Sequence, residues 1–414
     1  MQLLLNNIRQ LVTVANDGKP LKSGPAMRDL GVVENASVLI EDGRIQWIGA
    51  TGDFSRTLNA DADVLDCSPY VALPGFVDSH THALFGGSRE NEFALRAEGK
   101  TYQEIAAQGG GIASSVQATR TATKKELKKT TSRRLDTMMK HGTTTVEIKS
   151  GYGLSEHDEL KMLEAITELA TEHLITIRST FLGAHAIPPE YRERRSEYLS
   201  LLCERMLPHI AKRKLAQFCD VFCEMGYYTV AESRQVLEAA RKLGLGLKVH
   251  ADEFTSLGGT LLAAELGAVS VDHLEHISDE AISALHSAKT VAVVLPGVSF
   301  FLRNPYAPAR KLIDAGIPLA IASDFNPGSC MSFSMPLMMT IACTQMSVTP
   351  EEAITATTLN GAAALGLADE YGSIEVGKRA DIVLFEVPNY RYLAYHFGAN
   401  HAVKIIKHGT ILEF

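Results

Sequence analysis

The segment LPGFVDSHTH, residues 73–82, sets the pattern from which the fold of this 414-residue chain can be predicted. It is an apolar run of strand length that ends in side chains capable of chemistry, His80 and His82. Seven further runs of this character follow it, at 143–153, 175–185, 218–224, 245–253, 268–276, 289–297 and 317–328. Helical patterns fill the gaps, and the stretch 157–173 is clearly amphipathic.

Eight strands that alternate with helices predict an α/β fold of the (β/α)8 barrel type. A doubly wound sheet also alternates, but it usually has fewer strands and a glycine-rich first turn. The reactive side chains favour the barrel, because they come at the carboxyl ends of the runs, where barrels form their active sites. These residues are His80, His82, Tyr152, His185, Glu224, His250, Glu253, His273, His276 and Asp324.

The two ends of the chain have a different pattern. Segment 37–50 alternates apolar and polar residues around Asp42-Gly43, which is a strong hairpin signal. The C-terminal segment also consists of strand-like runs that are divided by glycine turns. We therefore predict that residues 1–67 and 373–414 form one small β-domain, and that residues 68–372 form the barrel domain.

Composition restricts the partners of the protein. Hydrophobic residues make up 46% and charged residues 21% of the chain, as in ordinary globular proteins, and the formal net charge is −8. An acidic balance argues against nucleic-acid and membrane-surface partners, although a pocket can still be locally positive for an anionic substrate. The six cysteines are scattered, and neither a signal peptide nor a membrane-spanning run is evident, so we expect a cytoplasmic protein.

Four of the strand-end residues have the character of a metal site. His80 and His82 are two apart on a strand, so their imidazoles project to the same side. An isolated His-x-His motif could also be two unrelated histidines. Here, however, His250 ends the fifth run and Asp324 ends the eighth, which supports a metal site. Three imidazoles and a carboxylate suit Zn²⁺ or iron, with a position left for water. Such an ion lowers the pKa of its water to about 7.

Two further residues have candidate roles in proton transfer. Glu253 follows His250 by three residues, and a carboxylate beside the ion that is not needed as a ligand suits a general base. The alternative for Glu253 is a surface carboxylate at the start of a loop. His273 ends the sixth run and can donate to a developing oxyanion.

Several of these motifs resemble the amidohydrolase superfamily. They are PGFVDSHTH, the histidines that end strands five and six, SDFNPG, and GSIEVGKRADIVLF near the C-terminus. The resemblance implies a barrel hydrolase with a composite β-sandwich built from both chain ends. Many members with two metals use a carboxylated lysine at the end of strand four. Here that strand ends in Cys223-Glu224, so a site with one ion is implied.

Seven finer segments, in order, are similar to the imidazolonepropionase family. They are SHTHALFGGSRENEF (79–93), GGGI (109–112), EIKSGYGL (147–154), FLGAHAIP (181–188), VHADEF (249–254), DHLEH (272–276) and SDFNPGS (323–329). The family implies cleavage of the ring amide of 4-imidazolone-5-propanoate, which gives N-formimidoyl-L-glutamate, and it suggests a homodimer. It makes His80, His82, His250 and Asp324 the metal ligands. The substrate contacts that it implies are Arg89, Tyr152, His185, Glu253, Asn326, Gly328 and Ser329.

The chemistry of that substrate is compatible with these residues. Arg89 can clamp a propanoate group through two hydrogen bonds, although a surface arginine is the commoner fate in a loop. Tyr152 and Ser329 supply hydroxyl donors. Lys149 is either an ion-paired barrel lysine or an electrostatic helper, and the triple glycine 109–111 suits a mobile loop near the pocket.

The mechanism that follows is a hypothesis about proton traffic. Activated water attacks the ring carbonyl carbon. Of Asp324 and Glu253, one takes a proton from that water and one passes it toward the leaving ring nitrogen. His273 stabilises the tetrahedral oxyanion. His185 orients the ring through a hydrogen bond.

Two alternatives remain open at this point. The first is a deaminase of a cyclic amidine, such as guanine or cytosine, on the same barrel; a neutral base would not need the cation of Arg89. The second is a metal-free barrel with a structural or interaction role. Such proteins usually lose ligands from the His-x-His pair or from strand eight, whereas this chain keeps all four.

Overall fold

The computed structural model describes residues 2–100, 104 and 110–413, and its larger unit is a barrel of eight parallel strands. The strands are hydrogen-bonded in chain order, and each lies within one of the eight predicted runs, so the predicted barrel is confirmed. They are β6 (Phe76–Asp78), β7 (Thr143–Lys149), β8 (Thr176–Ala184), β9 (Phe218–Cys223), β10 (Gly246–Ala251), β11 (Ser270–His273), β12 (Val291–Val294) and β13 (Leu319–Ile321).

The barrel is closed by the residues that follow its first and last strands. Thr81 forms a parallel β-bridge with Phe325. The backbone N–H of His82 donates to the carbonyl of Phe325 at 3.0 Å, and that of Asp324 donates to the carbonyl of His80 at 3.0 Å. The carboxyl ends of the first and eighth strands are therefore joined, and the side chains beside this seam are held close together.

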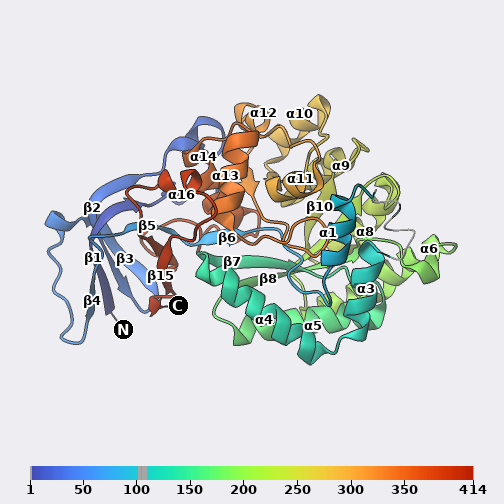
Figure 1. The fold of residues 1–414 in the computed structure, drawn as a ribbon, viewed down its shortest axis with the longest axis horizontal. Helices are drawn as coiled ribbons and strands as arrows, with labels where there is room; N and C mark the ends of the chain where they lie inside the picture. Colours follow the sequence, from blue (N-terminus) through green and yellow to red (C-terminus); the bar gives the residue numbers. More distant parts are fainter. Residues whose placement is uncertain (1, 101–103, 105–109, 414) are drawn as a thin grey trace.

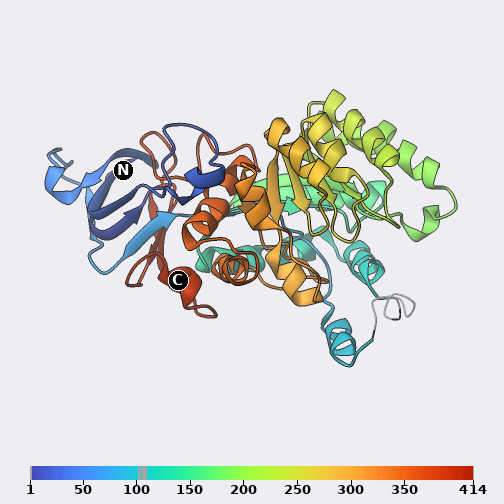
Figure 2. The ribbon, with the colours of Figure 1, turned by 90° about the horizontal axis from the view of Figure 1, so that it is seen from above.

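Helices surround the barrel strands and connect them (Figures 1 and 2). They are α1 (Glu90–Ala97), α3 (Ile112–Thr121), α4 (Lys124–Lys140), α5 (Glu156–Glu172), α6 (Arg195–Ser200), α7 (Leu207–Arg213), α8 (Val230–Lys242), α9 (Gly259–Leu266), α10 (Asp279–Ala288), α11 (Pro296–Leu302), α12 (Ala309–Asp314), α13 (Met335–Gln345), α14 (Pro350–Thr357), α15 (Leu359–Ala363) and α16 (Tyr392–Tyr395). Helix α5 begins where the Ser155 hydroxyl caps the N–H of Asp158 at 3.1 Å, within one residue of the predicted start. Among the described residues, no helix is both long and apolar enough to cross a membrane.

The two ends of the chain build a second sheet, which lies at the left of Figure 1 with both termini. Its path is β16-β15-β14-β5-β1-β2-β3, and β4 pairs with β1. The strands are β1 (Gln2–Val12), β2 (Val32–Glu41), β3 (Arg44–Ala50), β4 (Asp63–Asp66), β5 (Val71–Pro74), β14 (Ile382–Phe385), β15 (Ala402–Lys407) and β16 (Thr410–Leu412). Strand β5 follows residue 67 in the chain but belongs to this sheet; the domain boundaries at 67/68 and 372/373 stay predictions.

The predicted hairpin in this sheet is present. Glu41 pairs with Arg44 across the turn, and Asp42 and Gly43 both have positive φ angles, 48° and 76°. Positive φ at both central residues defines the tight turn whose twist matches that of the flanking strands. The sheet encloses a core of its own that is separate from the barrel core, with Leu5, Val38 and Ile382 among its buried residues.

Candidate active site

The seam that closes the barrel brings three predicted ligands together. His80 and His82 both follow β6, and Thr81 lies between them. The hydroxyl of Thr81 donates to the carbonyl of Glu147 at 2.5 Å. Oδ1 of Asp324 lies 3.4 Å from Nε2 of His80 and 3.4 Å from Nε2 of His82. All three side chains are buried, so the predicted pair from strand one meets the predicted carboxylate from strand eight.

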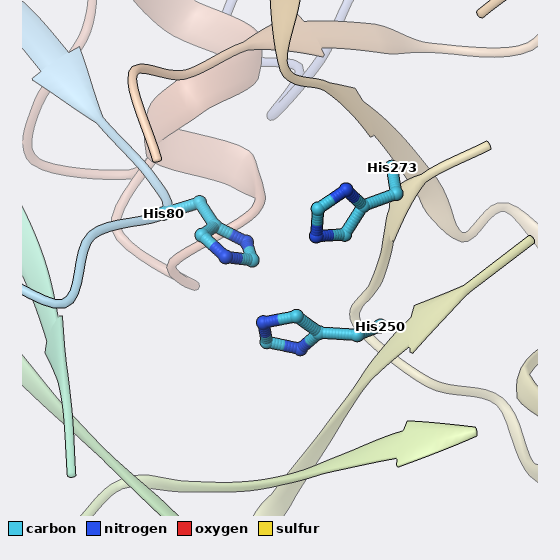
Figure 3. A group of neighbouring side chains, drawn as sticks. All are labelled: His80, His250 and His273. Carbon is cyan, nitrogen blue, oxygen red and sulfur yellow. The ribbon is translucent and has the colours of Figure 1, made fainter. Parts of the chain in front are cut away.

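Strands five and six add two more imidazoles at the same end of the barrel. His250 lies in β10, and its neighbour Ala251 pairs with His273 of β11. The ring centroids of His80 and His250 are 4.5 Å apart, and those of His250 and His273 are 5.3 Å apart. Figure 3 shows the three rings of His80, His250 and His273 pointing toward one another from the ends of three strands.

The donor atoms of this cluster fit a metal ion. Two sets of three residues have potential ligand atoms that all lie within 4.8 Å of one another, namely His80, His82 and Asp324, and His80, His250 and His273. Nε2 of His80, Nε2 of His250 and Oδ1 of Asp324 are buried and have no hydrogen-bond partner in the described structure. Buried polar atoms are normally satisfied, and imidazole and carboxylate donors suit zinc and iron.

A third set of donor atoms, from His80, Glu147 and Asp272, is already occupied by a cation of the protein itself. The ammonium group of Lys149 lies 2.7 Å from Oε2 of Glu147 and 3.7 Å from Oδ2 of Asp272. The donor atoms on the cavity side of His80 are thus the ones that the described part of the chain leaves without a hydrogen bond.

Carboxylates behind the imidazoles orient two of the candidate ligands. Nδ1 of His80 donates to Oδ2 of Asp272 at 2.6 Å, and Nδ1 of His250 donates to Oδ1 of Asp220 at 3.1 Å. Because a carboxylate accepts the Nδ1 proton, the lone pair of each ring is left on Nε2, which faces the cluster. The sequence interpretation missed both aspartates. Their signal was an acidic residue in the interior of a buried barrel strand.

A buried ionic network supports these aspartates from within the barrel. Lys149 contacts Asp220 and Glu147 at 2.7 Å each, and all three side chains are fully buried. Burial alone would lower the pKa of Lys149, but the charges of Asp220, Glu147 and Asp272 raise it well above its usual value. Lys248 lies 3.5 Å from Glu147. Of the two interpretations of Lys149, the ion-paired barrel lysine is the one that the structure shows.

Burial also sets the protonation of the cluster. Removal from water lowers the pKa of His80, His82 and His250, and neighbouring cationic groups add to this effect for His80 and His82. Burial raises the pKa of Asp324 to about 7. The three imidazoles are therefore neutral, which is the form that binds a metal ion.

Glu253 and His273 face each other beside the cluster. Oε2 of Glu253 lies 3.7 Å from Nε2 of His273, and Nδ1 of His273 lies 3.7 Å from Oε2 of Glu275. Burial raises the pKa of Glu253 to about 8. Burial opposes the protonated form of His273, but the charges of Glu253 and Glu275 outweigh it and raise the pKa to about 10. Glu253 can therefore exchange a proton near neutral pH, whereas His273 stays protonated and can donate a hydrogen bond. Glu253 is buried, so it is not the surface carboxylate of the alternative interpretation.

One cavity of about 940 Å³ opens over the cluster. It is lined by every residue that was predicted to contact the substrate and by the candidate ligands His82, His250 and Asp324. The predicted contacts along its wall are Arg89, Tyr152, His185, Glu253, Asn326, Gly328 and Ser329. The tertiary structure therefore gathers residues from the five loops that follow β6, β7, β8, β10 and β13 around a single space.

His185 has a defined orientation in this cavity. Its Nδ1 donates to the carbonyl of Gly151 at 3.0 Å, and its ring stacks on that of His82 with centroids 5.1 Å apart. The ring centroids of Tyr152 and His185 are 5.5 Å apart. Burial lowers the pKa of His185 to about 3, so the ring is neutral. With its proton on Nδ1, His185 presents Nε2 as an acceptor for an N–H group.

The loop after β13 is shaped by Asn326. Its Oδ1 accepts from the backbone N–H groups of Gly328 and Ser329 at 2.8 Å each. Its Nδ2 donates to the carbonyl of Asp324 and to Oγ of Ser329, both at 2.7 Å. All polar groups of the Asn326 side chain are thus used within the loop. Because Oγ of Ser329 accepts from Asn326, its own proton can be donated into the cavity.

Glu224 and Gly111, which were both noted in the sequence, take part in hydrogen bonds that hold loops around the site. Glu224, which ends strand four, accepts from the backbone N–H groups of Met225 at 2.8 Å and Phe254 at 2.9 Å, so it supports the loop that carries Glu253. Of the triple glycine, Gly109 lies outside the described residues. Gly111 donates its backbone N–H to Oε1 of Glu92 at 3.0 Å.

Comparison with known families gives one assignment for essentially the whole chain. Residues 71–412 match the model of the amidohydrolase family. The chain is 50% identical over 416 aligned residues to the imidazolonepropionase of Symbiobacterium thermophilum, covering 100% of this chain and 97% of that relative. It is 48% identical over 411 residues to the imidazolonepropionase of Clostridium tetani, covering 99% of this chain and 98% of that relative.

Solved structures of lower identity share the fold. An adenosine deaminase from Xanthomonas campestris with bound zinc has a TM-score of 0.72 at 18% identity, covering 99% of this chain and 92% of that one. A guanine deaminase from C. acetobutylicum with bound guanine has a TM-score of 0.70 at 15% identity, covering 100% of both chains. At this level of identity, the likeness shows a common architecture only.

Proposed function

The chain belongs to the amidohydrolase family and, within it, to the imidazolonepropionases, and from this premise we propose that it hydrolyses the ring amide of 4-imidazolone-5-propanoate to N-formimidoyl-L-glutamate. It is a metal-dependent hydrolase that acts on a carbon–nitrogen bond. Relatives at 45–50% identity over essentially the full chain favour this activity over the deaminase alternative.

One observation carries the assignment to this substrate. Arg89 also lines the cavity that opens over the imidazole cluster. The side chain of Arg89 is only 9% exposed, so it is not the surface arginine of the alternative interpretation. A small anionic ring amide needs both features, because its amide must reach the cluster while its carboxylate finds a cation. A neutral nucleobase has no group for the cation.

The proposed ligands are His80, His82, His250 and Asp324, which would hold one ion of zinc or iron per subunit. When bound, the ion supplies Lewis acidity that activates water near neutral pH. The unpartnered Nε2 atoms of His80 and His250 and the unpartnered Oδ1 of Asp324 support this set. His273 is left out of it because carboxylates lie 3.7 Å from each of its nitrogens, which favours a proton donor over a ligand.

The residues of the chain then perform the proton transfers of ring opening. A bond forms between water oxygen and the ring carbonyl carbon, and the bond from that carbon to the ring nitrogen breaks. Of Glu253 and Asp324, one takes a proton from the attacking water and one passes a proton to the leaving nitrogen. His273 donates to the carbonyl oxygen as negative charge develops on it.

The other cavity residues hold the substrate. His185 accepts a ring N–H at its Nε2, because its Nδ1 proton is committed to Gly151. Tyr152 and Ser329 contribute hydroxyl groups. Asn326 and Gly328 act through the shape of their loop, and Arg89 pairs with the propanoate.

A direct assay tests the activity. We expect the purified protein to remove the absorbance of 4-imidazolone-5-propanoate and to form N-formimidoyl-L-glutamate, with about one zinc or iron ion per chain by elemental analysis. Guanine and cytosine serve as controls and should release no ammonia. Ammonia release from a nucleobase, with the imidazolone left intact, would replace this proposal with the deaminase.

Two further properties are part of the proposal. The six cysteines are all free, which supports a reducing compartment such as the cytoplasm. The homodimer is proposed on family resemblance, and light scattering on the eluting protein tests it. A mass of one chain at assay concentration would contradict the dimer without affecting the catalytic assignment.

A further inference from the structure

Arg89 is held by a carboxylate that has no assigned role. Nε and Nη2 of Arg89 lie 2.9 Å and 2.7 Å from the same oxygen, Oε2 of Glu92. The two side chains are 9% and 13% exposed, so this pair is largely shielded from water. The second oxygen of Glu92 accepts from the backbone N–H of Gly111 at 3.0 Å. Glu92 therefore connects helix α1, which begins after Arg89, to the residue that precedes α3.

The contact leaves one edge of the guanidinium group for a ligand. A guanidinium can grip a carboxylate along its side edge, which is formed by Nε and Nη2, or along its end edge, which is formed by Nη1 and Nη2. Glu92 takes the side edge. The end edge lies against Gly328, since a Cβ added to Gly328 would come within 2.1 Å of Nη1. Arg89 and Gly328 both line the cavity. Because Glu92 takes the side edge, the end edge is the one that remains for a ligand.

A second arginine keeps this part of the cavity positive. Nη2 of Arg96 donates to the carbonyl of Gly328 at 3.1 Å, and its guanidinium lies 4.8 Å from the ring centroid of Phe301. Arg96 also lines the cavity. Arg96 therefore adds a second guanidinium group to the part of the cavity wall that contains Arg89 and Gly328.

We propose that Glu92 is a positioning residue that locks Arg89 with its end edge toward the substrate carboxylate. This inference rests on the proposed function, in which Arg89 binds the propanoate. A carboxylate suits the task because one of its oxygens holds Arg89 while the other holds the amide of Gly111. A glutamine has one acceptor oxygen, so it can serve only one of these partners. Locking the arginine before binding removes the cost of ordering a flexible side chain when the substrate arrives.

The test compares Glu92→Gln with Glu90→Gln in the metal-loaded enzyme. Glu90 is an exposed residue of the same helix, so its substitution is a matched loss of charge. We expect Glu92→Gln to raise KM about tenfold while kcat stays within about twofold, because an interaction made equally before and during the reaction is lost. Glu90→Gln should leave both constants unchanged.

Binding of two matched ligands separates positioning from a general disturbance. Imidazole-4-propanoate and imidazole-4-propanamide differ only in the carboxylate, and their Kd values can be measured by calorimetry. For Glu92→Gln we expect the propanoate to bind about tenfold more weakly and the propanamide to bind as before. Glu92→Asp keeps the charge but shortens the side chain, so it should also weaken the propanoate severalfold.

Three results would overturn the proposal. They are unchanged or tighter propanoate binding in Glu92→Gln, equal weakening of both ligands, and wild-type behaviour of Glu92→Asp, which would mean that charge alone matters. Failure of the proposed function is a separate outcome. In that case the wild type would not open the imidazolone ring, while the ratio of propanoate to propanamide affinity would still report on Glu92.

Discussion

Nδ1 of His80 donates to Oδ2 of Asp272 across 2.6 Å, and both side chains are completely buried. The aspartate thereby fixes the proton of the ring on Nδ1 and leaves Nε2 as the donor atom for a metal ion. This relationship joins residues that are 192 positions apart in the chain, and it makes a residue that touches no substrate important for the metal site.

Asp272→Asn should therefore weaken metal binding. An amide can present its N–H to Nδ1 and favour the wrong tautomer, so we expect the metal affinity to fall about 10- to 100-fold. Competition with a chelator of known affinity measures the effect. Asp381→Asn is a matched control, because Asp381 is a buried aspartate that pairs with Lys407 in the terminal sheet, away from the cluster. An unchanged affinity in Asp272→Asn would contradict the orienting role.

His273→Ala distinguishes the two possible ligand sets. We expect kcat to fall by about 10²–10³, as for the loss of an oxyanion donor, while one equivalent of metal is retained. Elemental analysis beside steady-state kinetics checks both points. Loss of the ion would instead support the set of His80, His250 and His273, whose donor atoms also lie within 4.8 Å of one another.

Gly328→Ala should disturb the anion clamp with little effect on the fold. The added Cβ would lie 2.1 Å from Nη1 and 2.8 Å from Cζ of Arg89, so the guanidinium must move. We expect KM to rise about tenfold or more, with the melting temperature nearly unchanged. In the control Gly52→Ala, the new Cβ meets no atom within 4 Å, and KM should remain that of the wild type. A normal KM in Gly328→Ala would mean that Arg89 does not bind the substrate from this position.

Glu352→Gln should produce a loss of stability that depends on pH. Glu352 accepts from the backbone N–H of Thr349 at 2.8 Å and from Arg310 at 2.8 Å. Burial would raise the pKa of Glu352, but these bonds and Arg28 outweigh it and hold the pKa below its usual value of 4.5. A depressed folded-state pKa means that the carboxylate stabilises the fold fully above 4.5 and loses this contribution as the pH falls through the folded-state value.

At pH 7 we therefore expect Glu352→Gln to melt about 2–4 °C below the wild type. The difference should shrink between about pH 5 and pH 3, because the wild-type carboxylate becomes protonated there. Glu280→Gln, at an exposed position, should match the wild type throughout. A gap of constant size across this pH range would show that the charge of Glu352 is not the stabilising element.

Local patterns were sufficient for the architecture. Each barrel strand lies within a predicted apolar run, the Asp42-Gly43 hairpin pairs as its turn chemistry requires, and α5 spans Glu156–Glu172 as its periodicity indicates. These features depend on neighbours in the chain, such as the alternation of a strand or the cap of a helix. The strand-end rule for barrels then predicted which residues share one face.

Local patterns did not reveal the partners of those residues. The sequence analysis assigned no role to Asp220, Asp272 or Glu92, and it left two possible roles for Lys149. The reason is that the neighbours of a charged residue in the sequence do not specify its partner in space. Their contacts arise only when strands far apart in the chain are set in register around the barrel. The same is true of the seam between Thr81 and Phe325, which brings Asp324 against His80.

The amino-acid sequence by itself thus determined the barrel, the terminal sheet and the strand-end residues that gather at the barrel mouth, since these follow from periodicity and from the strand-end rule. The further cavity residues came from the family resemblance. Only the tertiary structure decided which nitrogen of His80 and of His250 is bound to an aspartate, and which edge of Arg89 is bound by Glu92. The physical reason is that hydrogen bonds and ion pairs require atoms to meet within a few ångströms, and that proximity is created by barrel closure and strand register.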